Sequence, residues 1–509
     1  MIRELGENYV SQLREVYSGR VSGGADLVCF WFAKAWNQIA KGKCRFAGLV
    51  ATNAIRKGAN RTVLDSITKN GFIFEAWSDR PWILEGAAVR VSFICFSNSK
   101  ISTANLDGEV VTSINADLTG AGENETTDLT KVRTLETNAE ISFQGSQKIG
   151  AFDISLEKAR EWLVSPNAHG LPNSDVIKPS WNGVDLTRRP RDGWIIDFGT
   201  NISQERAALY EKPFQFVLEN VKPERDQNNR EMYRKFWWRH GEPRIAMREN
   251  LFRLNRFIAT SEVAKHRTFA WLPIEILPDK RLIVFARQDD AAFGILQSCL
   301  HEVWSLKLGS TLEDRPCYRP TTCFETFPFP RPTPKQEAAI AAAAKELNAL
   351  RERWLNPPEW TQTSTLEFRG TVGGAWSRYI DAKTVEEVIL PGQDDLPEKD
   401  RQKIHVGTVR YPRLEPRDAD CAALLKKRTL TNLYNERPAW LDLAHKKLDV
   451  AVAVAYGWVH AGQATVDLSD EAILEKLLAL NLERAAEEAK AAKGKKPKAQ
   501  REKQADEMV

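Results

Sequence analysis

Apolar residues in the first hundred positions fall into segments with two different patterns. Two segments have the character of helices, ADLVCFWFAKAWNQIA (25–40) and the amphipathic ANRTVLDSITKNG (59–71), and residues 1–17 are predicted as a further helix. Three shorter apolar runs predict strands: FAGLVAT (46–52), FIFEAWS (72–78) and VRVSFICF (89–96). This order predicts an α/β layer. Because three strands are about half of a doubly wound sheet, we expect the chain to begin inside a domain that ends at polar residues 116–130.

The rest of the chain shows two further patterns. Residues 131–330 alternate short strands with helices and turns, which predicts a separate α+β domain ending at the proline-rich FETFPFPRP. Residues 333–484 are mostly helical in pattern, with 361–420 irregular or strand-like, and Ser469 is a candidate N-cap of the last helix. The basic, low-complexity tail 485–509 is predicted to be disordered.

Composition describes an ordinary soluble protein. The 509 residues exceed what one core accommodates and suggest about three domains. No run reaches the roughly 18 apolar residues of a membrane span, and the N-terminus MIRELGENYV is not a secretory signal. We therefore expect a cytoplasmic protein with no membrane partner. Seven cysteines without a Cys-x-x-Cys pair support neither a disulfide framework nor a metal site.

Positive charge is concentrated in one segment, although the net charge is only +4. From Lys222 to Arg256 there are ten Lys or Arg against five Asp or Glu, with Tyr233, Trp237 and Trp238 interleaved. Basic side chains mixed with aromatic rings suit a phosphate backbone with stacked bases. A solvated helix face with aromatic residues packed beneath it would give the same pattern, so both interpretations stay open.

The segment LNPPEW (355–360) contains the Asn-Pro-Pro sequence of the catalytic loop in amino-methylating DNA methyltransferases. Here Glu359 follows the prolines, and the aromatic residue, Trp360, comes one place late. The catalytic loop also needs a preceding strand, whereas AAIAAAAKELNALRERW, which comes first, has strong helix propensity. Because proline cannot continue a helix, we interpret the segment as a helix stop.

Six stretches together resemble the MmeI-like type II restriction-modification DNA methyltransferases, over nearly the whole chain. They are GGADLVCFWFAKA, AGLVATNAIRKGANR, AWSDRPWILEGAAVRVSFICF, KPSWNGVDLTRRP, RPCYRPTTCFETFPFP and KKRTLTNLYNERPAWLDLAHKKLDVAVAVAYGW. The resemblance implies that residues 1–125 are the C-terminal half of a Rossmann-like methyltransferase domain specific for adenine N6. It implies a target-recognition domain over 131–330 and the helical C-terminal region over 333–484.

In this family the S-adenosylmethionine loop and the Asn-Pro-Pro-aromatic motif come earlier in the chain. The resemblance therefore implies that the catalytic motif would fall a few residues before Met1, so no catalytic residue is expected in this chain. The implied partners are double-stranded DNA and a companion chain carrying the missing half. S-adenosylmethionine is expected as a cofactor only when that half is supplied.

Three residues of the first region are candidates for the methyltransferase chemistry. By the resemblance, an aromatic residue at the end of strand 89–96 packs against a flipped adenine, and the matching position is Phe96, with Phe93 as a rival. Both rings suit a core equally well, but Phe96 lies at the strand end, where sites in open α/β sheets form. Asp26 and Phe30 match positions near the cofactor, although we prefer Asp26 as a helix N-cap.

Base readout in a DNA groove needs Arg, Lys, Asn or Gln side chains. Candidates lie in DLTRRPRDG, GEPRIAM, EVAKHRTF and EDRPCYRPTT. They are Arg188, Arg189, Arg191, Arg244, Lys265, His266, Arg267, Arg315, Tyr318 and Arg319. Each suits a phosphate contact or a surface charge as well.

Two functions follow from these observations. The first is a site-specific adenine-N6 DNA methyltransferase of a restriction-modification or phage-defence system, inactive as this chain alone. The second is a sequence-specific DNA-binding remnant or specificity subunit with no chemistry of its own.

Overall fold

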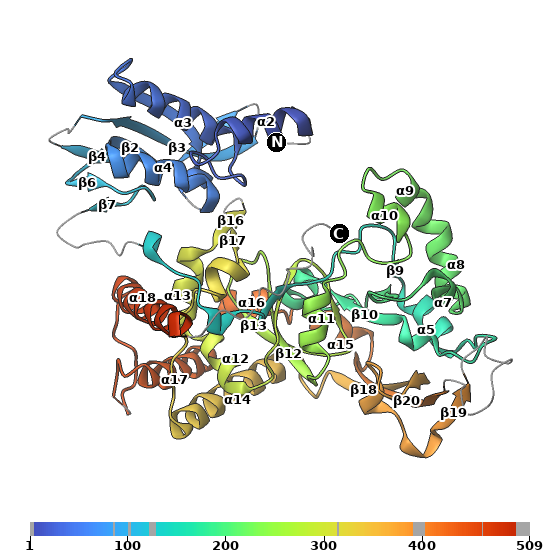
Figure 1. Ribbon diagram of the computed structural model, residues 1–509. Coiled ribbons are helices and arrows are strands. Elements are labelled where there is room, and N and C mark those ends of the chain that lie inside the picture. Colours follow the sequence, from blue (N-terminus) through green and yellow to red (C-terminus); the bar gives the residue numbers. More distant parts are fainter. Residues whose placement is uncertain are drawn as a thin grey trace. The chain divides into compact units, whose positions relative to one another are not determined.

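The computed structural model describes residues 5–56, 58–84, 87–99, 103–121, 129–312, 315–389, 403–460 and 462–494 (Figure 1). The chain divides into two compact units. Unit 1 comprises Met1–Lys131 and Ser310–Arg315, and unit 2 comprises Val132–Gly309 and Pro316–Val509. The boundary that was expected at residues 330–333, between the recognition domain and the helical C-terminal region, falls inside unit 2.

Unit 1 is an α/β layer built on the three predicted strands. These are β1 (Phe46–Thr52), β2 (Phe72–Leu84) and β3 (Ala87–Ser97), in the order β1-β3-β2. Since β3 is antiparallel to both neighbours, β1 and β2 run parallel, joined through α4 (Gly58–Asn70). α3 (Leu27–Ala40) and α4 cover one face of the sheet with their apolar residues. The predicted first helix is α2 (Glu7–Val16).

Four short strands extend this sheet beyond the three that the sequence pattern predicted. They are β4 (Ala104–Leu106), β5 (Glu109–Val111), β6 (Ser113–Ile114) and β7 (Gly120–Ala121). Asp107 and Gly108 connect β4 to β5 with positive φ angles of 55° and 93°, as a tight hairpin turn requires. The prediction missed these strands because they are too short to show an apolar pattern.

Among its described residues, unit 2 contains three sheets of three or four strands. The first two have the orders β14-β10-β11-β9 and β13-β12-β15-β8, and the third is β18-β20-β19. Their strands are β8 (Ser142–Gln144), β9 (Asp153–Ile154), β10 (Ile177–Trp181), β11 (Trp194–Ile196), β12 (Arg256–Ser261), β13 (Phe269–Pro273), β14 (Leu277–Pro278), β15 (Leu282–Phe285), β18 (Thr361–Thr371), β19 (Glu386–Ile389) and β20 (Lys403–Pro416). β16 (Ser310–Leu312) and β17 (Arg315–Cys317) form a separate pair.

The third sheet shares its core with the predicted recognition region. Trp376, which follows β18, is buried and stacks on Trp194 of β11 with 6.1 Å between ring centroids. The Ser174 hydroxyl donates a hydrogen bond to the Arg369 carbonyl of β18 at 2.7 Å. These contacts explain why the chain after residue 333 is part of the same compact unit.

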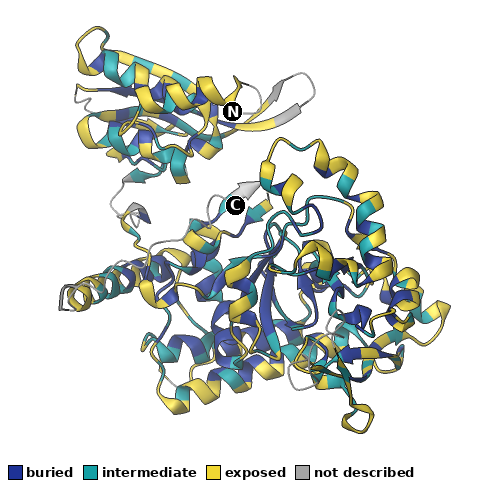
Figure 2. Ribbon diagram, turned by 45° about the vertical axis from the view of Figure 1, so that its right-hand side comes forward, coloured by how far each residue is buried: buried dark blue, intermediate teal, exposed yellow. Residues whose placement is uncertain are grey.

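Five helices of unit 2 pack together around buried side chains (Figure 2). They are α12 (Asp290–Gln297), α13 (Cys299–Leu308), α14 (Pro334–Leu355), α17 (Ala439–Ala455) and α18 (Asp470–Gly494). Gly294 lets α12 approach its neighbours, because a Cβ there would lie 2.9 to 3.0 Å from side-chain atoms of α14 and α17. None of the helices described here is long and apolar enough to cross a membrane.

The last helix begins as predicted and ends later than predicted. Ser469 is confirmed as its N-cap, since its hydroxyl accepts from the Ala472 amide at 3.2 Å. α18 continues to Gly494, so the first part of the predicted disordered tail is helical. Residues 495–509 lie outside the described residues. The other α-helices described in unit 2 are α5 (Leu156–Val164), α6 (Gly183–Thr187), α7 (Gln204–Ala208), α8 (Glu211–Asn220), α9 (Lys222–Asp226), α10 (Glu231–Lys235), α11 (Ile245–Leu251), α15 (Ala419–Leu425) and α16 (Leu430–Glu436).

Candidate nucleic-acid interface

The loop between β12 and β13, residues 262–268, holds two arginine side chains at the surface. The carboxylate of Glu262 accepts from Arg319 at 2.9 Å and from Arg281 at 3.2 Å. Glu262 itself is buried, whereas the arginine side chains are 50% and 55% exposed. Two guanidinium groups on one carboxylate leave a net positive charge and fix the direction of both side chains.

The same loop contacts α16 on its other side. Lys265 Nζ and His266 Nε2 both donate to the amide oxygen of Asn435, at 2.7 and 2.8 Å. One turn earlier on α16, the Thr431 hydroxyl donates to the Thr187 carbonyl at 3.0 Å. α16 therefore connects the loop to the end of α6, where the next residue, Arg188, is exposed.

The chain that leads into α16 adds further positive charge. Lys426 and Lys427 are exposed, and the Lys427 carbonyl accepts from the Asn432 side chain of α16. We call the surface residues around α16 and the loop the basic cluster: Arg188, Lys265, His266, Arg281, Arg319, Lys426 and Lys427. The sequence prediction missed Arg281, Lys426 and Lys427. The signal for the two lysines was the basic run KKR directly before the N-cap Thr429.

Two of the residues predicted to contact bases are instead buried beneath the loop. Arg267 is 3% exposed and donates to the Thr260 hydroxyl at 3.0 Å and to the Ser261 carbonyl at 2.6 Å. Tyr318 is 1% exposed, and its hydroxyl lies 2.9 Å from His301 Nε2. The prediction that Arg267 and Tyr318 contact bases is wrong for this fold, because neither side chain reaches the surface.

Three other candidates are held by contacts with nearby residues of unit 2. Arg191 donates two hydrogen bonds of 2.9 Å to the buried carboxylate of Asp185. Arg189 donates to the Leu355 carbonyl at 3.0 Å and to Asn356 Oδ1 at 2.8 Å. Arg244 pairs with Glu242 at 2.7 Å. These contacts favour structural roles, although Arg191 stays largely exposed. Arg315 is exposed in β17, and by its contacts belongs to unit 1.

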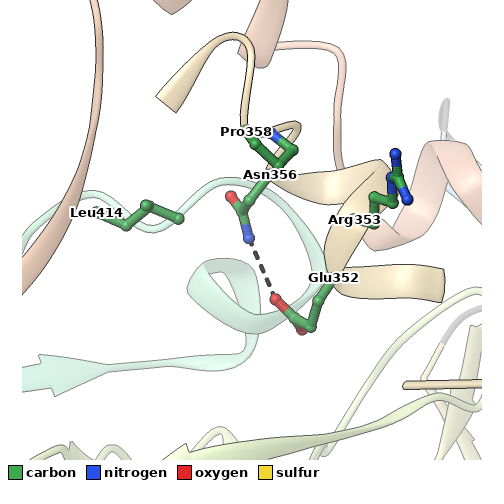
Figure 3. A pocket seen from close by; sticks show the side chains of 5 residues that line it. All are labelled: Glu352, Arg353, Asn356, Pro358 and Leu414. Atoms are coloured by element: carbon green, nitrogen blue, oxygen red, sulfur yellow. Dashed lines mark hydrogen bonds between the residues drawn. The ribbon is translucent and has the colours of Figure 1, made fainter. Parts of the chain in front are cut away.

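The LNPPEW segment is confirmed as a helix stop. α14 ends at Leu355, and Asn356 is its C-cap. Figure 3 shows the Asn356 amide turned toward Glu352, to which it donates at 3.2 Å, in a shallow hollow beside Arg353, Pro358 and Leu414. Because Asn356 Oδ1 also accepts from Arg189, both ends of the amide are engaged.

The carbonyl groups of the two prolines are used as well. The Pro357 carbonyl accepts from the Thr361 hydroxyl, and the Pro358 carbonyl accepts from Arg417, each at 2.9 Å. The guanidinium of Arg428 lies over the ring of Trp360, 5.0 Å from the ring centroid. The groups that a methyltransferase loop would offer to a substrate amine are thus engaged in holding the end of α14 and the start of β18.

The basic and aromatic segment 222–256 is not a stacking platform. It forms α9, α10 and α11 rather than one helix, and Tyr233, Trp237 and Trp238 are 4% to 6% exposed in the core. Arg225 is also buried, and donates to the Ile149 carbonyl at 2.8 Å among others. The structure supports the interpretation in which aromatic residues pack beneath a solvated surface.

The candidates of unit 1 lie in its core or at a helix start. Phe96 is fully buried and stacks on Phe32 at 5.8 Å, so the prediction that it packs on a flipped base is wrong for this structure. Phe30 is buried in the core, with its ring in edge-to-face contact with Tyr17 at 5.2 Å. Asp26 stands at the N-cap position of α3 but makes no capping bond, and its carboxylate accepts from Asn60 at 2.7 Å.

Phe96→Ala is expected to lower the free energy of unfolding of unit 1 by about 3–5 kcal/mol, because it leaves a cavity beneath α3. DNA affinity of the folded variant should not change. Thermal unfolding followed by circular dichroism measures the first effect. A variant as stable as the parent would show that the ring is not a core residue.

Comparison with known proteins places part of the basic cluster, but not Arg188, Lys426 or Lys427, inside a matched family. Residues 203–331, which include the loop 262–268, Arg281 and Arg319, match a family described as the target recognition domain of MmeI. The fold is similar to that of MmeI itself, a type IIL restriction-modification enzyme solved in complex with DNA. The TM-score is 0.64 at 17% sequence identity, covering 94% of this chain and 55% of the MmeI chain. A search of curated proteins finds no match.

At this level of identity the similarity shows the fold alone. The chain spans little more than half the length of the MmeI chain. The chain therefore has a fold similar to that of a restriction-modification enzyme, and residues 203–331 of unit 2 match the target-recognition-domain family.

Proposed function

We propose that this chain recognises a specific sequence in double-stranded DNA as part of a restriction-modification DNA methyltransferase. The observation that carries the proposal is the loop 262–268, in which Lys265 is exposed and Glu262 binds the half-exposed side chains of Arg281 and Arg319. Arginine side chains held in a fixed direction suit the two acceptors of guanine in the major groove. Lys426, Lys427 and Arg188 suit the phosphates on either side.

The wider proposal is methyl transfer to adenine N6. S-adenosylmethionine would supply the methyl group, but Phe30 and Asp26 do not fit a cofactor site, since one is in the core and the other is bound to Asn60. The cofactor would then be held by a companion polypeptide. The same observation favours a second candidate function, a specificity subunit or DNA-binding remnant without chemistry of its own.

S-adenosylmethionine is expected not to bind the isolated chain with micromolar affinity. Isothermal titration calorimetry of the purified chain measures this directly. Clear micromolar binding would show that the chain carries a cofactor site of its own, and would favour the complete enzyme over the specificity subunit.

DNA binding is expected to proceed without cofactor and to weaken steeply with salt. Six phosphate contacts would give a slope of about −5 for log affinity against log salt concentration. Fluorescence anisotropy with a labelled duplex at four salt concentrations measures the slope. A binding constant independent of salt would contradict a phosphate-contacting surface.

A further inference from the structure

Arg351 of α14 has a buried guanidinium that reaches the end of the loop 262–268. The residue is 1% exposed, and its guanidinium donates to the Phe269 carbonyl at 2.7 Å and to Gln297 Oε1 at 3.1 Å. Phe269 directly follows the loop and begins β13. Hydrogen bonds from a charged donor are stronger than neutral ones, and burial strengthens them further. Arg351 therefore joins α14 firmly to the end of the loop.

Both polar groups of the Phe269 backbone are held in this way. The Phe269 amide donates to Gln297 Oε1 of α12 at 2.9 Å, and the carbonyl accepts from Arg351. Because Gln297 also accepts from Arg351, the three residues form a closed set of hydrogen bonds. One residue earlier, the Thr268 carbonyl accepts from the Thr260 hydroxyl at 2.8 Å. The end of the loop is thus fixed by buried side chains of β12, α12 and α14.

The same guanidinium lies beside α16, the helix that contacts the loop on its other side. Its central carbon is 5.8 Å from the ring centroid of Tyr434, which is within the range of a cation–π contact. The Tyr434 ring is also 6.0 Å from the ring of His266 in the loop. The next residue, Asn435, binds the loop with its side chain. Arg351 therefore contacts both the end of the loop and the helix that holds its middle.

We propose that Arg351 is a positioning residue for DNA recognition, which fixes the loop 262–268 through Phe269 and Tyr434 without touching DNA. Burying a guanidinium costs free energy that an apolar side chain would not, and a role in directing the loop accounts for this cost. Arg351 lies outside residues 203–331, so the helical C-terminal region would help to determine recognition by the matched segment. A loop that is ordered before binding loses less conformational entropy in the complex. The inference rests on the proposed function.

Arg351→Met tests this role, because it removes the guanidinium and keeps most of the apolar stem. Hydrogen exchange of residues 262–268 should become faster in the variant. Affinity for a duplex enriched from a random pool by the parent chain should fall about tenfold, the cost of ordering one or two side chains on binding. Affinity for a random duplex of the same length should fall less than threefold, and the salt slope should not change, because the phosphate contacts remain.

Arg225→Met is the matched control. Arg225 is also 1% exposed in unit 2 and donates to the Ile149 and Lys148 carbonyls at 2.8 and 2.9 Å, away from the loop. This variant should lose stability but keep the loop exchange rates and the ratio of the two affinities. Circular dichroism establishes a temperature at which both variants are folded. If Arg351→Met does not fold, Arg351→Lys replaces it, with a smaller change in the same direction because lysine lacks the planar fork.

Unchanged loop exchange and an unchanged affinity ratio in the Arg351 variant would overturn the proposal. An equal change in Arg225→Met would overturn it as well, since the effect would then follow from general destabilisation. DNA binding by the parent chain separates the two ideas. If the parent enriches no sequence, the proposed function fails, while faster loop exchange in the Arg351 variant alone would still support its positioning role.

Discussion

The double variant Lys426→Glu, Lys427→Glu is expected to bind duplex DNA about 100-fold more weakly than the parent chain at physiological salt. Each lysine that contacts a phosphate releases close to one counterion, and a glutamate in its place adds repulsion. Both lysines are exposed, in the short segment before the Thr429 N-cap of α16. The salt slope should become shallower by about two units.

Lys335→Glu with Lys490→Glu is the matched control, because it changes the net charge equally. These lysines are exposed on α14 and α18, and Lys335 lies at the opposite end of α14 from Trp354, where Arg428 packs. The control should lose less than threefold in affinity. If both double variants lose affinity equally, DNA binding depends only on the net charge of the protein, and the basic cluster is not the interface.

The second large effect is expected at Asp197, a buried carboxylate that joins three parts of unit 2. It accepts from Arg248 at 2.7 and 3.0 Å and from Lys178 at 2.9 Å. Burial opposes the charge of Asp197, but Arg248 and Lys178 outweigh it and hold the pKa of the carboxyl well below its usual value. Asp197→Asn should lower the free energy of unfolding by about 3–5 kcal/mol, because both cations lose their counter-charge.

Urea unfolding at neutral pH measures this loss. Asp153→Asn is the matched control, since Asp153 pairs with Lys148 at the surface, is 57% exposed, and should contribute at most ~1 kcal/mol. Equal costs for the two substitutions would contradict the role given to Asp197.

The charged groups around Asp197 also predict how the stability of unit 2 depends on pH. Burial lowers the pKa of His240, 4.0 Å from Asp197, to about 4. An unfolded chain takes up this proton near pH 6.5, so the contribution of neutral His240 is complete above about 6.5 and is lost as pH falls toward 4. Stability of unit 2 should therefore decline below about pH 6.5, and less steeply in His240→Gln. Equal slopes for the two proteins would show that His240 is not neutral and buried.

Local patterns predicted the elements well where each element is long and its contacts are local. The apolar runs gave β1, β2 and β3, and the alanine-rich segment followed by two prolines gave α14 and its end. The pairing of β18 with β20 could not be predicted in the same way, since the two strands are polar on alternate positions and lie more than thirty residues apart. Such pairing depends on contacts that a local pattern does not contain.

The burial and grouping of the site residues are even less predictable from local sequence patterns. Arg267 and Arg319 are the same residue type, yet one is buried under the loop and the other is half exposed beside Glu262. Phe96 and Phe93 differ only in the face of β3 on which they lie. The basic cluster gathers residues from 188 to 427, so only the fold brings them together.

Selection of bound duplexes from a random DNA pool by the purified chain tests the central claim most directly. The account predicts enrichment of one recurrent sequence, and loss of that enrichment in Arg281→Ala and Arg319→Ala, while Lys335→Glu retains it. Salt-sensitive binding without any enriched sequence would contradict sequence recognition by this chain.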